Sequence, residues 1–103
     1  MMVADINLLG RLQDWYVSQC DGGWEHAYGI SIATLDNPGW KFNVDLTDTD
    51  LIGRTFDDIL FEGKDNNDWY QCRTRDDDFE GHCGLHHLSD VIAIFLNWAD
   101  GKG

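Results

Sequence analysis

The sequence is poor in basic residues, in proline and in long apolar runs. Only seven of its 103 residues are Lys or Arg, against 19 Asp or Glu, so the formal net charge is −12. A nucleic-acid-binding protein needs a basic face that displaces counterions, and this composition argues against one. No apolar run approaches the ~20 residues needed to span a bilayer. The first five residues also lack the basic start and apolar run of a signal peptide.

Cysteine is scarce as well. Cys20, Cys72 and Cys83 are an odd number and too few for a disulfide scaffold, so reduced thiols and a cytoplasmic location are expected. The common catalytic signatures are missing too. We find no GxSxG elbow, no P-loop and no Rossmann glycine run. No cofactor is therefore expected, and the protein is predicted not to be an enzyme.

What the chain does contain is enough apolar material for one core. Hydrophobic residues make up 43% of it, including five Trp and five Phe. This share excludes a disordered chain despite the acidity. A length of 103 residues predicts a single domain over residues 1–103. The acidity indicates either simple solubility or a basic partner.

The clearest local pattern is a β-hairpin within residues 24–46. Trp40, Phe42, Val44 and Leu46 alternate with polar residues, which is the period of a strand with one buried face. An apolar alternation over residues 28–33 precedes it, with the DNPG tetrapeptide between them. Pro38 presets φ for a tight turn, and a positive φ at Gly39 is expected to complete it.

The other elements follow from periodicity. Residues 5–20 and 85–100 carry apolar stripes at three- and four-residue spacing and are predicted helices, with Asp5 as an N-cap and Gly101 after the last C-cap. Residues 56–62 and 69–75 are predicted strands, with a turn at 76–78 and a short edge strand at 79–81. The fold class is therefore α+β. We expect a meander of four or five antiparallel strands with the N-terminal and C-terminal helices packed on it.

Two groups of residues are candidates for chemistry. His82, Cys83 and His86 cluster near the last helix, with Cys72 on the preceding strand, but no second ligand pair completes a zinc set. Cys83, His86 and Glu25 are the candidates if the chain is instead a small enzyme or a metal-binding protein. On a strand, the adjacent Glu25 and His26 would point to opposite faces. The alternative for that stretch is structural, with Trp24 packed under the helix end and Glu25 bonded to a nearby backbone group or cation.

Acidic side chains crowd the predicted loops, beside Trp40, Trp69 and Tyr70. Carboxylates interleaved with exposed aromatic residues suit an interface with a basic protein, because the aromatics supply contact area and the charges steer the encounter. The alternative is that these aromatic side chains belong to the core and the acids are simply solvated.

Several blocks along the chain resemble the immunity protein 53 family. The most specific are WEHAYG (residues 24–29) and TLDNPGW (residues 34–40), and residues 12–16, 68–72, 79–81 and 95–99 fit as well. The resemblance covers nearly the whole chain. It implies an immunity protein of a bacterial polymorphic-toxin system, which binds a cognate toxin domain and neutralises it inside the producing cell.

Charge and resemblance together predict an acidic plug over a basic, nuclease-type toxin. The residues expected to contact the toxin are acidic with one exception: Glu25, His26, Asp57, Asp58, Asp65, Asp68, Asp76, Asp77, Asp78 and Glu80.

Overall fold

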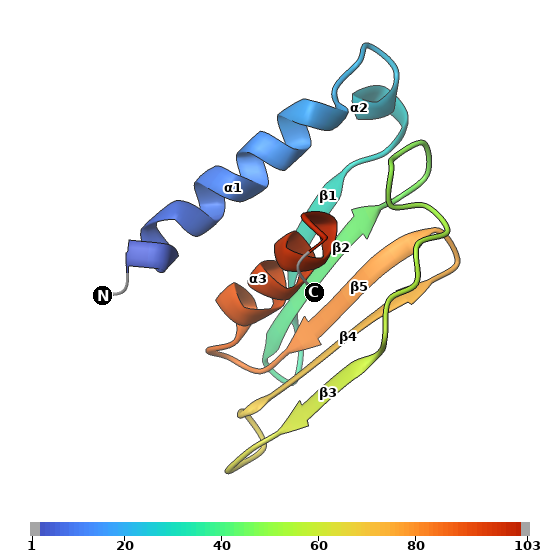
Figure 1. Ribbon diagram of the computed structural model, residues 1–103. Coiled ribbons are helices and arrows are strands. Elements are labelled where there is room, and N and C mark those ends of the chain that lie inside the picture. The colour runs from blue at the N-terminus through green and yellow to red at the C-terminus, as the bar shows by residue number, and fades with distance from the viewer. Residues whose placement is uncertain (1–2, 102–103) are drawn as a thin grey trace.

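The computed structural model describes residues 3–101 and consists of one antiparallel sheet with helices on one face (Figure 1). The predicted α+β class is confirmed. The elements in chain order are α1 (Val3–Gln19), α2 (Trp24–Ala27), β1 (Ile30–Leu35), β2 (Gly39–Asp45), β3 (Ile59–Glu62), β4 (Trp69–Arg75), β5 (Asp78–Cys83) and α3 (Leu88–Ala99). None of the helices within residues 3–101 is long and apolar enough to cross a membrane.

The strand order is β1-β2-β5-β4-β3, which is not that of one uninterrupted meander. After the β1–β2 hairpin the chain crosses to the far edge, and β3, β4 and β5 then return to close the sheet against β2. The prediction of a short edge strand at residues 79–81 is therefore wrong. That segment lies in the central strand, paired on both sides. Its two inward side chains of note, Phe79 and Cys83, are fully buried, as a central strand requires.

One face of the sheet carries the core. The rows across the strands place Phe42, Gly81 and Cys72 side by side on this face, which α3 covers. Gly81 is needed there because a Cβ at this position would overlap the side chain of Val91 on α3. The absence of a side chain thus lets the helix approach the middle of the sheet.

Aromatic rings fill the space between helix and sheet. Phe79 lies 5.1 Å from Phe95 and 5.3 Å from Phe56, measured between ring centroids, and Phe42 lies 5.7 Å from Phe95. The rings meet edge-on or tilted, the arrangements that the aromatic quadrupole favours. α1 adds Leu8 and Leu12 to this core, at the four-residue spacing predicted for its stripe.

The helix ends differ from the predictions. α1 starts at Val3, so Asp5 lies inside the helix and is not its N-cap. α3 starts at Leu88 rather than residue 85, because the chain first makes a turn in which the His87 amide donates to the Gly84 carbonyl. Gly101 has φ of 80° directly after the C-cap, as predicted.

The β1–β2 hairpin is confirmed, but Gly39 has another role in it than expected. Gly39 is the first residue of β2, paired with Leu35, and is not among the residues with positive φ. A Cβ at Gly39 would overlap the carbonyl of Cys83 on β5. Glycine is required at this position because two backbones approach closely, not because the turn needs a left-handed residue.

Candidate interaction surface at one end of the sheet

The two ends of the sheet differ in what they gather. At one end lie the β1–β2 turn, the β3–β4 loop and the start of α3. At the other end the β4–β5 turn meets the segment after β2, since the Leu46 amide donates to the Asp77 carbonyl at 2.8 Å. α2 is fastened to this second end by Trp24, whose Nε1 donates to the Thr47 carbonyl at 3.0 Å.

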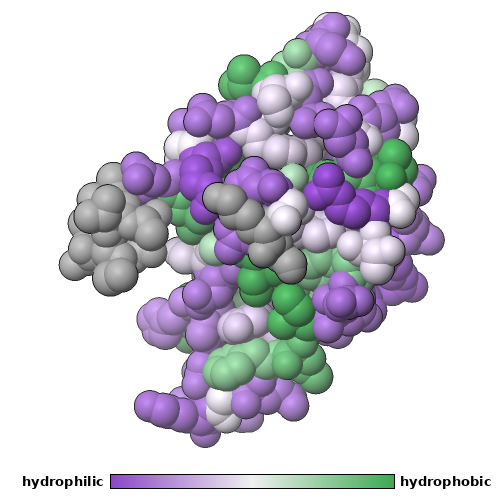
Figure 2. Space-filling view, viewed as in Figure 1, coloured by the Kyte–Doolittle hydropathy of each residue, from purple (hydrophilic) through white to green (hydrophobic). Residues whose placement is uncertain are grey.

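We call the second end the acidic end. Seven of the residues predicted to bind a partner lie at or near it, in α2, in the β4–β5 turn, at the start of β5 and in the segment that leads into β3. Three further aspartates join them from the end of β2 and the loop after it: Asp45, Asp48 and Asp50. Figure 2 shows that hydrophilic side chains also cover most of the helix-bearing face, with a hydrophobic strip in its lower half.

Six carboxylates of the acidic end are exposed and have neither an ion pair nor a side-chain hydrogen bond within residues 3–101. They are Asp48, Asp50, Asp57, Asp58, Asp76 and Asp77. Asp48 and Asp76 also have positive φ, 63° and 56°, a conformation that aspartate tolerates better than most residues. These six side chains are available to a partner, because no interaction within the described chain engages them.

Asp78 and Asp45 are neighbours on adjacent strands, and each accepts a hydrogen bond from another residue. They face one another across β5 and β2, and the Asn43 side-chain amide donates to Asp78 at 3.4 Å. Burial, followed by the neighbouring Asp45 carboxylate, raises the pKa of Asp78. Asp45 in turn accepts from the Gly29 amide at 2.8 Å. The register of β2 against β5 brings Asp45 next to Asp78, although the two residues are far apart in the sequence.

Glu80 lies on the face of the sheet that no helix covers. Its carboxylate accepts from Nε of Arg73 at 3.1 Å, a neighbour in the same row across β4 and β5. Both side chains are partly buried, at 34% and 20% exposure. Glu80 is therefore already neutralised within the protein, unlike the six exposed aspartates.

The sequence predicted that Glu25 and His26 lie on a strand, but they lie in the single helical turn α2. Glu25 accepts hydrogen bonds from the amides of Asp21 and Gly22, at 3.0 and 2.8 Å. Backbone donors, its own amide first, lower the pKa of Glu25. Trp24 is 3% exposed and packs against Trp15 of α1 at 5.9 Å. The structural interpretation of this stretch is confirmed for Trp24 and Glu25, whereas His26 is exposed.

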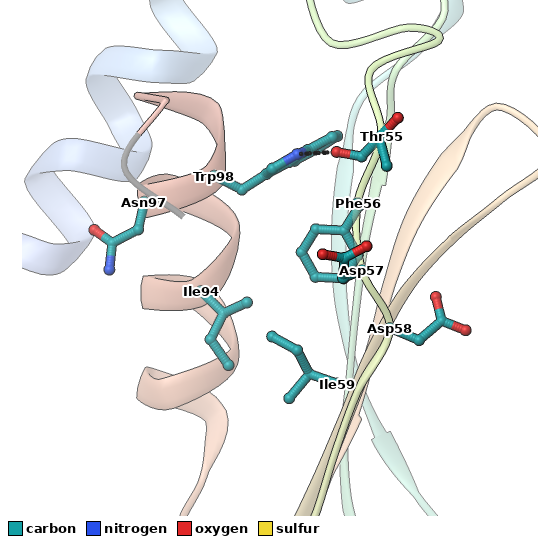
Figure 3. A pocket seen from close by; sticks show the side chains of 8 residues that line it. All are labelled: Thr55, Phe56, Asp57, Asp58, Ile59, Ile94, Asn97 and Trp98. Atoms are coloured by element: carbon teal, nitrogen blue, oxygen red, sulfur yellow. Dashed lines mark hydrogen bonds between the residues drawn. The ribbon is translucent and has the colours of Figure 1, made fainter.

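Asp57 and Asp58 flank a cavity of about 370 Å³ between α3 and the segment that enters β3 (Figure 3). Phe56, Ile59 and Ile94 give it an apolar lining, while the Asp58 carboxylate points away from it. The Trp98 ring closes one side, with Nε1 donating to the Thr55 carbonyl at 3.0 Å. Asp58 is thus presented to solvent by a segment anchored on α3.

Asp65 and Asp68 lie in the β3–β4 loop, at the end of the sheet opposite to the acidic end. Asp68 bonds Nε2 of His87 at 2.6 Å and accepts from the Lys64 amide at 2.9 Å. The Lys64 amide, followed by His87, lowers the pKa of Asp68. His87 bonds a second carboxylate, Asp90, through Nδ1 at 2.6 Å. The ten predicted residues therefore do not form one continuous surface.

The candidate metal and enzyme residues are not assembled into one site. Cys72 and Cys83 are buried free thiols, and burial raises their pKa values to about 12 and about 11. Cys83 pairs with Trp40 near the β1–β2 turn, whereas Glu25 precedes the opposite end of β1, roughly 20 Å away at ~3.3 Å per strand residue. His86 is exposed in the turn before α3. Within residues 3–101 no three His, Cys, Asp or Glu side chains are grouped so that they would hold a metal ion.

The aromatic residues beside the acids are half-buried rather than exposed. Trp40 and Tyr70 pack against the core, and Nε1 of Trp40 donates to the Leu85 carbonyl at 3.1 Å. Sequence reasoning missed His87, which bridges two carboxylates, and Asp45, which the sheet register places against Asp78. The HH dipeptide before the last helix was the available signal for the first. Nothing local indicated the second.

One comparison with known proteins identifies a relationship. The family model described as immunity protein 53 matches residues 9–100. No curated protein and no solved structure matches the chain.

Proposed function

The chain belongs to the immunity protein 53 family, and from this premise we propose that it neutralises a cognate toxin domain by covering a basic site with its acidic end. An immunity role follows from the family. The toxin class and the surface are our proposal. The observation that carries it is the set of six exposed, unpaired aspartates on a chain of net charge −12.

Electrostatics indicates the class of toxin. An enzyme that cleaves nucleic acid holds phosphates in a basic groove, and carboxylates spaced along loops occupy the positions that phosphates would take. Exposed acids gain little from single contacts in water, but together they steer the encounter and raise the association rate. Steering of this kind is screened by salt over ~8–10 Å at physiological ionic strength.

The test measures the rate of association by stopped-flow at several salt concentrations. The partner is the C-terminal domain of the protein that the gene immediately upstream encodes. The double variant Asp76→Asn, Asp77→Asn removes two charges from the acidic end, and asparagine tolerates the positive φ of residue 76. We expect association to slow about tenfold and its salt dependence to become shallower.

The matched control is Glu62→Gln, Asp65→Asn, which makes the same change in net charge at the end of β3 and in the β3–β4 loop, at the opposite end of the sheet. It should alter the rate by less than about twofold, since these charges lie away from the acidic end. Equal effects of the two double variants would leave net charge as the cause and remove the acidic end as the binding surface. An association rate that does not respond to salt would contradict electrostatic steering altogether.

Co-expression separates inhibition by binding from catalysis. Cells that produce the toxin domain should survive with the wild-type chain and equally with the Cys83→Ala, His86→Ala variant. The Cys83 thiol is 1% exposed, and its raised pKa leaves almost no thiolate at neutral pH, so a nucleophilic role for it is not favoured. Loss of rescue in a folded double variant would instead favour an enzyme or a metal site.

A further inference from the structure

β1 is an edge strand without the usual protection. Among residues 3–101 it pairs with β2 alone, and its six residues, ISIATL, include no charge, no proline and no glycine. Its pairing with β2 runs from Ile30 to Leu35 without a bulge. Natural proteins usually shield such an edge with charges, proline, a bulge or a covering element, because it is a ready template for another strand.

The register identifies which backbone groups point outward. The Asp45 amide donates to the Gly29 carbonyl at 3.0 Å, so Gly29 directs its backbone toward β2. Backbone direction alternates along an antiparallel strand, so residues 31, 33 and 35 also face β2. The amides and carbonyls of Ile30, Ile32 and Thr34 therefore point away from the sheet. None of them has a hydrogen-bond partner among residues 3–101.

The side chains near this edge are accessible too. Ile32 lies in the row of Phe42, on the helix-bearing face, yet it is 43% exposed. The helical layer therefore does not reach over β1 in the way it covers β2 and β5. Two more apolar side chains are exposed on α1, which lies on the β1 side of α3: Leu9 at 60% and Tyr16 at 37%. An added strand would find apolar partners on this face as well as backbone donors and acceptors.

We propose that the outer edge of β1 is the docking strand for an extended segment of the toxin domain, which pairs with Ile30, Ile32 and Thr34 as a sixth strand of the sheet. This mode of binding takes its affinity from main-chain hydrogen bonds and its specificity from alternate side chains. The inference rests on the proposed function, and it adds a contact made by backbone rather than by charge.

Charge selects a toxin segment over a second copy of this chain. Two copies would bring together formal net charges of −12 each. The carboxylates at the two ends of β1, Asp36 in the turn and Asp45 beside Gly29, would then lie near those of the other copy. The same carboxylates attract a segment that carries Lys or Arg at its ends.

The test replaces Thr34 by proline. Thr34 is exposed and its amide points outward, so Thr34→Pro removes one donor and places a ring on the edge without breaking a bond to β2. The matched control is Leu60→Pro on β3. The Gly63 amide donates to the Asp68 carbonyl, so Leu60, three residues earlier, also points outward from its edge, and it is 64% exposed. Titration calorimetry with the upstream-encoded C-terminal domain should show affinity at least about 30-fold weaker for Thr34→Pro and within about threefold of wild type for Leu60→Pro.

Hydrogen exchange on the wild-type complex gives a second measurement that needs no variant. The amides of Ile30, Ile32 and Thr34 should become protected when the domain binds, while that of Leu60 stays unchanged. Wild-type binding with unprotected β1 amides, or with equal affinity for Thr34→Pro, overturns the docking strand and leaves the proposed function standing. Absence of wild-type binding overturns both. Dimerisation of the chain alone that Thr34→Pro abolishes would instead assign the edge to self-pairing.

Discussion

The two edges of the sheet are built differently. β1 has six uncharged residues, and the side chains of Ser31 to Thr34 are exposed. β3 has four residues, is preceded by Asp57 and Asp58, and ends in Glu62. Charges and shortness are what protect an edge against pairing with another chain. The difference indicates that the β3 edge is protected against pairing with another chain, whereas the β1 edge is not.

The β3 edge is fixed by side-chain contacts as well as by strand pairing. Phe61 stacks on Tyr70 at 5.0 Å, and His87 contacts both rings while it bridges Asp68 and Asp90. These contacts tie the β3–β4 loop to the start of α3. β1 is held by its pairing with β2 from Ile30 to Leu35, which two hydrogen bonds between Gly29 and Asp45 continue.

The largest loss of stability should come from a substitution in the core between the two edges of the sheet. Phe79 is 0% exposed and lies between Phe42, Phe56 and Phe95. Phe79→Ala should lower the free energy of unfolding by about 3–5 kcal/mol, since it removes transfer free energy and leaves a cavity. Urea denaturation measures the loss, and Phe61→Ala, at a 38% exposed side chain, should lose much less. Similar losses for the two variants would contradict a single core beneath β2, β5 and β4.

The next largest loss of stability should affect the β1–β2 and β3–β4 hairpins one at a time. A Cβ at Gly84 would overlap the Asn67 carbonyl in the β3–β4 loop, and one at Gly39 would overlap the Cys83 carbonyl beside the β1–β2 hairpin. Gly84→Ala and Gly39→Ala should each cost about 2 kcal/mol of unfolding free energy, because backbone has to move. Hydrogen exchange should rise in β3–β4 for the first and in β1–β2 for the second.

Gly10→Ala is the control for both glycine variants. Nothing lies within 4 Å of a Cβ at Gly10, which is inside α1, so this change should stabilise the protein by up to ~1 kcal/mol. Destabilisation by all three variants would show that close backbone approach is not the reason for Gly39 and Gly84.

The smallest effect is a pH dependence confined to the β3 side. Hydrogen bonds to Asp90 and then to Asp68 raise the pKa of His87. The stabilisation from protonated His87 is therefore complete below its ordinary pKa of about 6.5 and is lost as the pH rises through the higher folded-state value. Unfolding free energies from pH 6 to 9 should decrease for the wild type and change less for His87→Gln. His86→Gln, at an exposed position, should keep the wild-type slope; if it flattens the slope equally, the assignment to His87 is wrong.

Local patterns carried most of the secondary structure. The alternation over residues 40–46 and the aromatic-rich run at 69–75 each correspond to a strand, and the stripe of Ile92, Phe95 and Leu96 corresponds to the buried face of α3. Local patterns failed for Glu25, where a single helical turn replaces the expected strand entry. A one-turn helix is too short to show a period, and here hydrogen bonds from Asp21 and Gly22 stabilise it.

The candidate surface was less accessible to prediction than the fold. Exposed acids in a turn were correctly expected for Asp76 and Asp77, whereas Asp57 lies before β3 and not in the strand predicted over residues 56–62. Their neutralised counterparts, Glu80 with Arg73 and Asp68 with His87, look the same in sequence. The ion pairs that distinguish them join residues from different strands or from a loop and a helix. Their formation therefore depends on how the elements are placed, not on the residues nearby.

The amino-acid sequence by itself determined the fold class, the acidity and most strand and helix positions, because these depend on composition and on periods of two or 3.6 residues. It also carried the family relationship, through specific blocks such as WEHAYG and TLDNPGW. The tertiary structure alone decided the strand order, and with it the central position of β5 and the open edge at β1. It also decided which carboxylates remain unpaired and why Gly39 is glycine. The physical reason is that strand pairing and backbone approach join residues distant in the chain, and a local pattern contains no information on which strand becomes the neighbour.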